Sequence, residues 1–146
     1  MMTILSTDKV KLNVNIKDKY EAIRMVGQML VDAGHAPQAY IEKMIEREES
    51  LSTYIGGGLA MPHGTNESKA LIQSTGMAII VVPAGVDFGG EEPAQLIIGL
   101  AAVGDDHLDI LTNVAVLVSE EEDMQRILNA SSEQELISIF ESGMVS

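Results

Sequence analysis

GMAIIVVPAGVDFGGEEPAQLIIGLAAV occupies residues 76–103 and decides the fold class of this chain. Its two apolar runs, residues 76–82 and 93–102, are rich in Ile, Val and Ala and are bounded by Pro or Gly, which is typical of strands that are buried on both faces. Residues 86–88 are expected to form a short extension between them. Because such strands need a covering layer on each side, the stretch predicts a sheet with helices on both faces.

The residues before this stretch predict one strand and two helices. Apolar and polar residues alternate over residues 10–16, the period-two pattern of a strand with one buried face. Asp18 and Glu21 form a capping-box pattern, so we expect a helix that starts here and ends at Gly34. Pro37 suits the first turn of a second helix, because proline is well tolerated where no intrahelical N–H is needed.

The residues after the stretch are expected to be helical. Asp105 or Asp106 can cap a helix that runs through Val118. Two further capping boxes predict one helix each: Ser119 with Glu122, and Ser132 with Glu135. Strands and helices therefore interleave without an internal repeat or a linker, and we expect an α/β fold with one domain over residues 1–146.

Composition narrows the possible functions. The 146 residues include no cysteine and carry a formal net charge of −13, so disulfides and cysteine zinc sites are excluded. Residues 70–146 contain one basic residue, Arg126, against 13 acidic ones, which disfavours nucleic acid as a partner. The apolar runs are far shorter than a bilayer span, and residues 1–10 lack the apolar core of a signal peptide. We therefore expect a cytoplasmic protein without membrane insertion.

His63 is the strongest candidate for chemistry. It stands in Met61-Pro62-His63-Gly64-Thr65, straight after three consecutive glycines at 56–58, in a stretch with the pattern of a loop. Pro62 restricts the backbone and Gly64 leaves one side of the ring uncovered, so a neutral imidazole could act there as a nucleophile. A loop histidine that only bonds to the backbone is the alternative. The glycines do not have the spacing of a nucleotide-binding loop.

The other candidates have weaker support from their surroundings. His107 begins a predicted helix, whose free N–H groups suit an anion such as phosphate, but it could also be an ordinary first-turn residue. Arg47 could bind phosphate oxygens through its guanidinium group, or could belong to a solvated charged helix face. His35 follows the expected helix end and is predicted to be a surface loop residue without a role. No close histidine pair favours a metal site, so a zinc-dependent hydrolase remains only a third possibility.

The run Thr53–Thr65, TYIGGGLAMPHGT, resembles the active-site segment of the enzyme IIA domains of the bacterial phosphoenolpyruvate-dependent sugar phosphotransferase system, mannitol/fructose class. Residues 46–48, 83–89 and 98–108 agree with that family, and the resemblance extends over roughly residues 5–140. Within the family, the Pro-His-Gly-Thr motif and the short chain are most similar to the mannitol-specific single-domain form.

This resemblance implies a mixed central sheet flanked by helices, and a phosphotransferase that works through a phosphohistidine. His63 would take a phosphoryl group from the carrier protein HPr, on Nε2 as the family does, and pass it to a cysteine on the enzyme IIB domain of a mannitol or fructose-type permease. His107 would orient the phosphoryl oxygens and Arg47 would stabilise their charge. Neither a cofactor nor a metal is implied.

Two further expectations depend on the same resemblance. A transient docking patch is expected around His63, with Leu59, Met61 and Leu108 as candidates for its apolar centre. The alternative function is that of a regulatory paralogue, in which a partner protein senses the phosphorylation state of His63 and no sugar is transported.

Overall fold

A five-stranded sheet lies at the centre of the computed structural model, which describes residues 4–143. The strands are β1 (Val10–Lys11), β2 (Tyr54–Gly56), β3 (Leu59–Ala60), β4 (Gly76–Val86) and β5 (Ala94–Ala101). Their order in the sheet is β1-β4-β5-β3-β2. The pairs β1 with β4 and β3 with β5 are parallel, whereas β4 with β5 and β2 with β3 are antiparallel. The sheet is therefore mixed.

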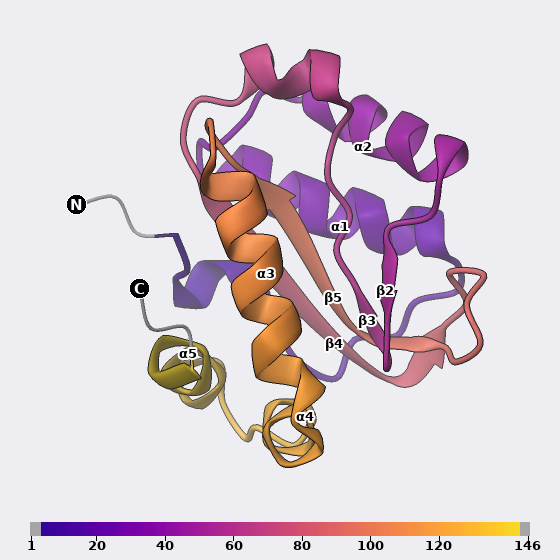
Figure 1. The fold of residues 1–146 in the computed structure, drawn as a ribbon, viewed down its shortest axis with the longest axis vertical. Coiled ribbons are helices and arrows are strands. Elements are labelled where there is room, and N and C mark those ends of the chain that lie inside the picture. Colours follow the sequence, from indigo (N-terminus) through magenta and orange to yellow (C-terminus); the bar gives the residue numbers. More distant parts are fainter. Residues whose placement is uncertain (1–3, 144–146) are drawn as a thin grey trace.

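Helices cover both faces of this sheet, as Figure 1 shows. The α-helices are α1 (Lys19–Asp32), α2 (Ala39–Ser50), α3 (Asp106–Ser119), α4 (Glu121–Leu128) and α5 (Glu133–Gly143), and two short 3-10 helices are η1 (Thr7–Lys9) and η2 (Asn66–Leu71). One face packs against α1 and α2, and the other against α3, α4 and α5. This arrangement confirms the predicted α/β class with helices on both sides.

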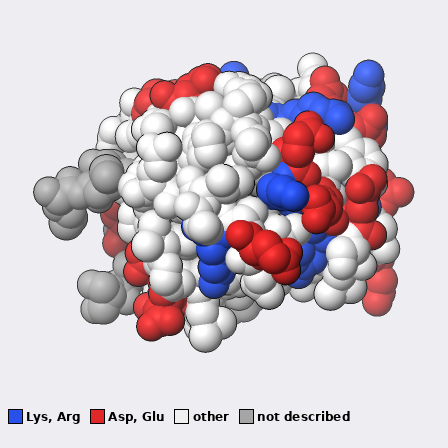
Figure 2. Space-filling model, turned by 90° about the horizontal axis from the view of Figure 1, so that it is seen from above, with Lys and Arg blue, Asp and Glu red and all other residues white. Residues whose placement is uncertain are grey.

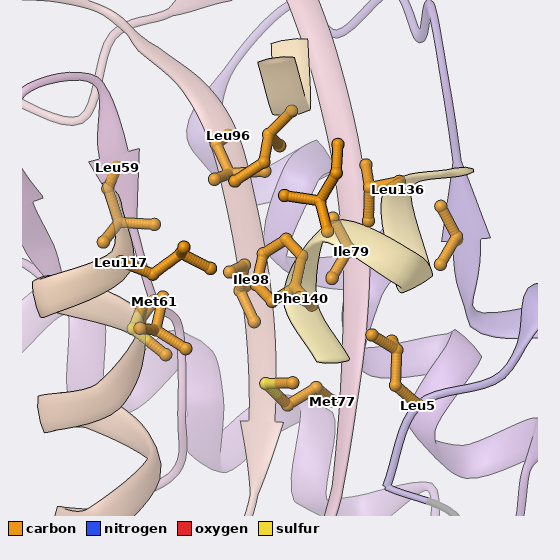
Figure 3. Packing of buried hydrophobic residues seen from close by; sticks show 14 of the residues in the cluster. Leu5, Leu59, Met61, Met77, Ile79, Leu96, Ile98, Leu117, Leu136 and Phe140 are labelled. Carbon is orange, nitrogen blue, oxygen red and sulfur yellow. The ribbon is translucent and has the colours of Figure 1, made fainter. Parts of the chain in front are cut away.

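The two central strands are apolar on both faces because each face has its own core. In β4, Met77, Ile79 and Val81 join one buried cluster, while the residues between them join the other. Figure 3 shows the first cluster, where Ile79 and Ile98 of neighbouring strands pack with Phe140 of α5. Burying one large apolar side chain contributes roughly 1.5–3 kcal/mol, so these strands anchor the fold.

Capping residues set several helix ends, as predicted. The Asp18 side chain accepts a hydrogen bond of 2.9 Å from the Glu21 amide at the start of α1. Beyond the end of α1, Gly34 has a φ of +85°, which glycine adopts without steric cost. At the start of α5, the Ser132 hydroxyl accepts a bond of 3.1 Å from the amide of Glu135. These caps satisfy amides that the helices themselves leave unpaired.

Other local predictions were wrong or incomplete. Strand β1 pairs over only two residues, because Asn13 has a φ of +55° and interrupts the extended backbone. Ser119 does not cap α4, since its hydroxyl donates to the Val116 carbonyl and the N-cap residue is Glu120. Asp105 occupies the N-cap position of α3 without a side-chain cap bond. The predicted loop after α2 contains the β2–β3 hairpin.

No helix within residues 4–143 combines the length and the apolar character that crossing a bilayer requires.

Candidate functional site

His63 lies at the edge of the sheet where β5 ends. It follows β3 and forms a parallel bridge with Leu100 of β5, and the Leu100 amide donates to the Pro62 carbonyl at 2.9 Å. The next segment after β5 leads into α3, which brings His107 in its first turn to the same edge. The two imidazole rings are 4.7 Å apart between centroids and meet edge to face at 72°. Segments more than 40 residues apart thus meet at one place.

Tyr40 of α2 holds the backbone just after His63. Its hydroxyl accepts a bond of 2.9 Å from the Gly64 amide and donates one of 3.0 Å to the Leu100 carbonyl. A Cβ atom on Gly64 would lie 2.5 Å from the Tyr40 ring and from the Ser68 hydroxyl. Glycine is therefore required at this position for the close approach of Tyr40, and the approach fixes the direction in which His63 leaves the chain.

The ring of His63 has one nitrogen bound and one nitrogen free for chemistry. Its Nδ1 lies 2.8 Å from the Met61 carbonyl oxygen, which can only accept, so Nδ1 carries the proton and Nε2 carries the lone pair. Burial of the half-buried ring is the main cause that lowers the pKa of His63 to about 4, and the nearby charges of His107 and Arg47 lower it further. The ring is therefore neutral at pH 7.

His107 is held in a cationic environment. Burial is the main cause that lowers the pKa of His107, followed by the positive charges of Lys69 and Arg47. The loop before it is fixed by Thr75, whose hydroxyl donates to an Asp106 carboxylate oxygen at 2.7 Å and accepts from the Val103 amide at 3.1 Å. This ring also favours the neutral form, and its position is set by the loop that joins β5 to α3.

Arg47 lies in the last turns of α2 and is the third candidate site residue, after His63 and His107. Its guanidinium group donates to the Leu51 carbonyl, beyond the end of the helix. Its charge lowers the pKa of both His63 and His107, so it acts electrostatically on both rings. The structure thus brings the three predicted residues into one region. Sequence reasoning missed Lys69 of η2, because no motif marks a lysine six residues beyond His63.

These groups suit the transfer of an anion. A neutral imidazole with a free Nε2 can attack an electrophilic phosphorus, and nearby cationic and N–H groups can stabilise the charge of the phosphoryl oxygens. Within residues 4–143, no three side chains of His, Asp or Glu gather as a metal site requires.

The prediction for His35 was wrong. The ring is 3% exposed, its Nδ1 lies 2.8 Å from the Ser74 hydroxyl, and its Nε2 lies 2.7 Å from Lys9 Nζ. It is buried because the chain returns across it at the start of β4, where a Cβ on Gly76 would come within 2.2 Å of the ring. The helix end that predicted a surface loop carried no information about this long-range packing.

The expected docking patch was also partly wrong. Leu59 and Met61 have no exposed surface, because they point into the core cluster between the sheet and α3. Leu108, next to His107, is 67% exposed. Strand β3 is buried on both faces of the sheet, and a strand of two residues in a glycine-rich segment is too short to show this in the sequence.

Comparisons with known proteins agree with this geometry. The family model described as "Phosphoenolpyruvate-dependent sugar phosphotransferase system, EIIA 2" matches residues 3–143. The mannitol-specific phosphotransferase enzyme IIA component of Bacillus subtilis (strain 168) is 44% identical over 139 residues, which cover 95% of this chain and 97% of that protein.

Two solved structures from Escherichia coli are similar throughout. Enzyme IIA of mannitol in complex with phosphorylated enzyme IIB has a TM-score of 0.89 at 32% identity, covering 94% of this chain and 97% of that one. The crystal structure of IIA mannitol has a TM-score of 0.86 at 33% identity, covering 93% and 98%. This chain therefore belongs to the EIIA type 2 family of the phosphoenolpyruvate-dependent sugar phosphotransferase system.

Proposed function

We propose that this protein is the phosphoryl carrier of a mannitol uptake system, with His63 as the residue that is phosphorylated. It accepts a phosphoryl group from phosphorylated HPr and passes it to a cysteine on the enzyme IIB domain of the sugar permease. The observation that carries this proposal is the state of the His63 ring: Nδ1 is bonded to the Met61 carbonyl, and Nε2 is free beside His107.

In the first step, the Nε2 lone pair of His63 attacks the phosphorus of phospho-HPr. The new N–P bond forms as the N–P bond to the HPr histidine breaks, and that histidine keeps the electron pair. Such a loose transition state requires in-line placement and charge stabilisation more than proton transfer. The ring of His63 gains positive character, and the Met61 carbonyl stabilises it by accepting from Nδ1–H.

Two other residues have roles in both directions of transfer. We assign to His107 the orientation of the phosphoryl oxygens, since its ring lies 4.7 Å from that of His63. Arg47 stabilises the negative charge of the phosphoryl group through a planar set of donors. In the second step, the thiolate of the enzyme IIB cysteine attacks the same phosphorus, and the electron pair returns to Nε2.

The surface around the site suits partners that dock in turn. Three apolar residues close to the site residues in the chain are exposed: Leu108 directly follows His107, Val103 precedes it by four residues, and Leu51 follows Arg47 by four. Figure 2 looks onto the end of the molecule where β5 ends and α3 begins, and it shows a broad area free of charged side chains beside one where both signs mix. An apolar centre with a polar rim is typical of transient interfaces.

The proposal extends to the organisation and location of the chain. Residues 1–146 form one phosphoryl-carrier domain, and it acts in the cytoplasm, where HPr and the enzyme IIB domain would meet it. The regulatory alternative is not favoured, because the relatives from Bacillus subtilis and Geobacillus stearothermophilus, at 44% and 41% identity, are mannitol-specific components.

The test is transfer to a defined acceptor. Phosphorylated protein, freed of HPr, is mixed with the enzyme IIB domain of a mannitol permease, and in parallel with that of a fructose-type permease. We expect the phosphoryl group to move to the cysteine of the mannitol domain faster than to the other. A phosphoryl group that stays on the protein with both acceptors would favour the regulatory function.

A further inference from the structure

Glu48 is a fully buried carboxylate at the end of α2. Its side chain has no exposed surface. One oxygen accepts from the Thr53 amide at 2.8 Å and from the Thr53 hydroxyl at 2.5 Å, and the other lies 3.3 Å from Lys19 Nζ. Burying a charge is costly unless it is paired and hydrogen-bonded, so all three contacts are needed to keep this carboxylate here.

The contacts of Glu48 continue to the ring of His63. The Thr53 carbonyl accepts a bond of 3.0 Å from the Met61 amide. The Met61 carbonyl in turn accepts from Nδ1 of His63 at 2.8 Å. A continuous series of hydrogen bonds therefore leads from the buried carboxylate through two backbone units to the nitrogen opposite the reactive one.

The segment that holds Met61 is anchored by the pairing of β3 with β2 and β5 and by backbone hydrogen bonds on either side of Met61. Strand β3 has only two residues, and the three glycines that precede it, residues 56–58, all have positive φ. On one side the Leu100 amide of β5 holds the Pro62 carbonyl. On the other side Met61 is held by Thr53, which is itself held by Glu48. The direction of the Met61 carbonyl thus depends on both sides.

We propose that Glu48 is a positioning residue for phosphoryl transfer: by fixing Thr53, it keeps the Met61 carbonyl where it takes the Nδ1 proton of His63, so that Nε2 remains the nucleophile. This inference rests on the proposed function. The same end of α2 carries Arg47, so this helix sets both the tautomer of the nucleophile and the position of the cation beside it.

Without this support, the two neutral tautomers of His63 would come closer in energy. A hydrogen bond to a well-placed carbonyl stabilises the tautomer that donates it, and this bond is the one that distinguishes Nδ1–H from Nε2–H. A ring with its proton on Nε2 has no lone pair at the position that faces the donor. Misplacement of the ring itself costs rate as well.

The experiment compares three variants with the wild-type protein. Glu48→Met keeps the length of the side chain and removes both oxygens, Glu48→Gln keeps one acceptor for Thr53, and Glu49→Gln changes the exposed neighbouring carboxylate as a control. Two quantities are measured: the rate of phosphorylation by phospho-HPr, and the protonation of each ring nitrogen of His63 from two-bond ¹H–¹⁵N spectra of the unphosphorylated protein.

We expect Glu48→Met to lower the phosphorylation rate by about 10-fold to 100-fold and to move part of the His63 population to the Nε2–H tautomer. Glu48→Gln and Glu49→Gln should stay close to the wild type in both measurements. If Glu48→Met does not fold, Thr53→Val, which removes the hydroxyl and keeps the amide, should show a smaller change of both quantities in the same direction.

Three results would overturn the inference. One is an unchanged rate in the folded variants, and another is a reduced rate with an unchanged His63 tautomer, which would make Glu48 merely structural. The third is a Glu48→Gln protein as slow as Glu48→Met. If the wild type itself accepts no phosphoryl group, the proposed function fails, while the tautomer measurement still decides whether Glu48 sets the protonation of His63.

Discussion

At the scale of single residues, the site depends on a histidine that stays neutral. Burial disfavours the charged ring, and the positive charges nearby act in the same direction. The bond from Nδ1 to the Met61 carbonyl opposes this shift only in part. The proposed nucleophile therefore does not have to lose a proton at neutral pH before it reacts.

The titration of His63 is therefore the first prediction. The pKa of His63 is about 4 in the folded protein, against 6.5 for the unfolded chain. Between these values the unfolded chain binds a proton that the folded one does not, so the contribution of this ring to stability is complete above pH 6.5 and is lost as the pH falls toward 4. An NMR titration should give a midpoint near pH 4.

Charge removal provides the control for this titration. Arg47→Gln should raise the pKa of both His63 and His107, because it removes a nearby positive charge from each. Arg24→Gln, on the exposed face of α1, should leave both unchanged. A His63 midpoint near 6.5 in the wild type would contradict the account of a desolvated ring.

The sequence selected the three candidate site residues but not the residues that hold them in place. His63 could be selected from its own motif, whereas His107 and Arg47 were selected only through the family resemblance, because their own surroundings gave weak support. Tyr40 and Glu48 could not be selected, because their roles depend on partners that only the fold supplies. The Tyr40 hydroxyl, for example, bonds to a carbonyl 60 residues away.

At the scale of elements, the position of α2 relative to the His63 loop decides the geometry of the site. The Tyr40 hydroxyl links this helix to the Gly64 amide and to the end of β5. Burial raises the pKa of Tyr40 to about 12, so the hydroxyl keeps its proton and can both donate and accept. Two backbone groups beside His63 therefore depend on one oxygen.

Removing the Tyr40 hydroxyl should destabilise the loop that carries His63. Tyr40→Phe keeps the packing but leaves the Gly64 amide and the Leu100 carbonyl without this partner, at a cost of about 1–3 kcal/mol in the free energy of unfolding. Urea unfolding and the hydrogen exchange rate of the Gly64 amide measure the effect. Tyr20→Phe, at a partly buried tyrosine of α1, is the control and should change stability little. A Tyr40→Phe protein with wild-type stability and exchange would refute the role of this hydroxyl.

Helices and strands with a clear pattern of apolar residues could be predicted from the sequence. Strands that are defined by pairing with distant segments could not. The apolar runs of β4 and β5 and the stripes of the helices follow directly from which faces are buried. The β2–β3 hairpin was missed, because its strands have three and two residues and are joined through glycines. The pairing of β3 with β5 exists only once the sheet has formed.

At the scale of the whole molecule, the site lies open at one end of the sheet, where large partners can reach it. Figure 1 shows η2, the end of β5 and the start of α3 gathered at this end. Among the large apolar side chains that the described residues expose, Leu108 is the one adjacent to His107. A protein that exchanges two partners needs such a surface to be accessible and only moderately apolar.

A charge placed on this surface should weaken docking and leave the fold intact. Leu108→Glu should raise the KM for phospho-HPr by at least about fivefold, since a central apolar contact contributes about 1 kcal/mol or more. Val116→Glu changes an equally exposed residue further along α3 and is the control. The free energy of unfolding of both variants should lie within about 0.5 kcal/mol of the wild-type value. Equal KM values for the two variants would place the docking surface elsewhere.

The central claim is that His63 carries the phosphoryl group. The measurement that tests it most directly is the intact mass of the wild type and of His63→Gln after incubation with enzyme I, HPr and phosphoenolpyruvate. We predict one acid-labile phosphoryl group on the wild type and none on the variant, with both proteins folded. A wild type without the adduct, or a variant that gains it equally, would contradict the account.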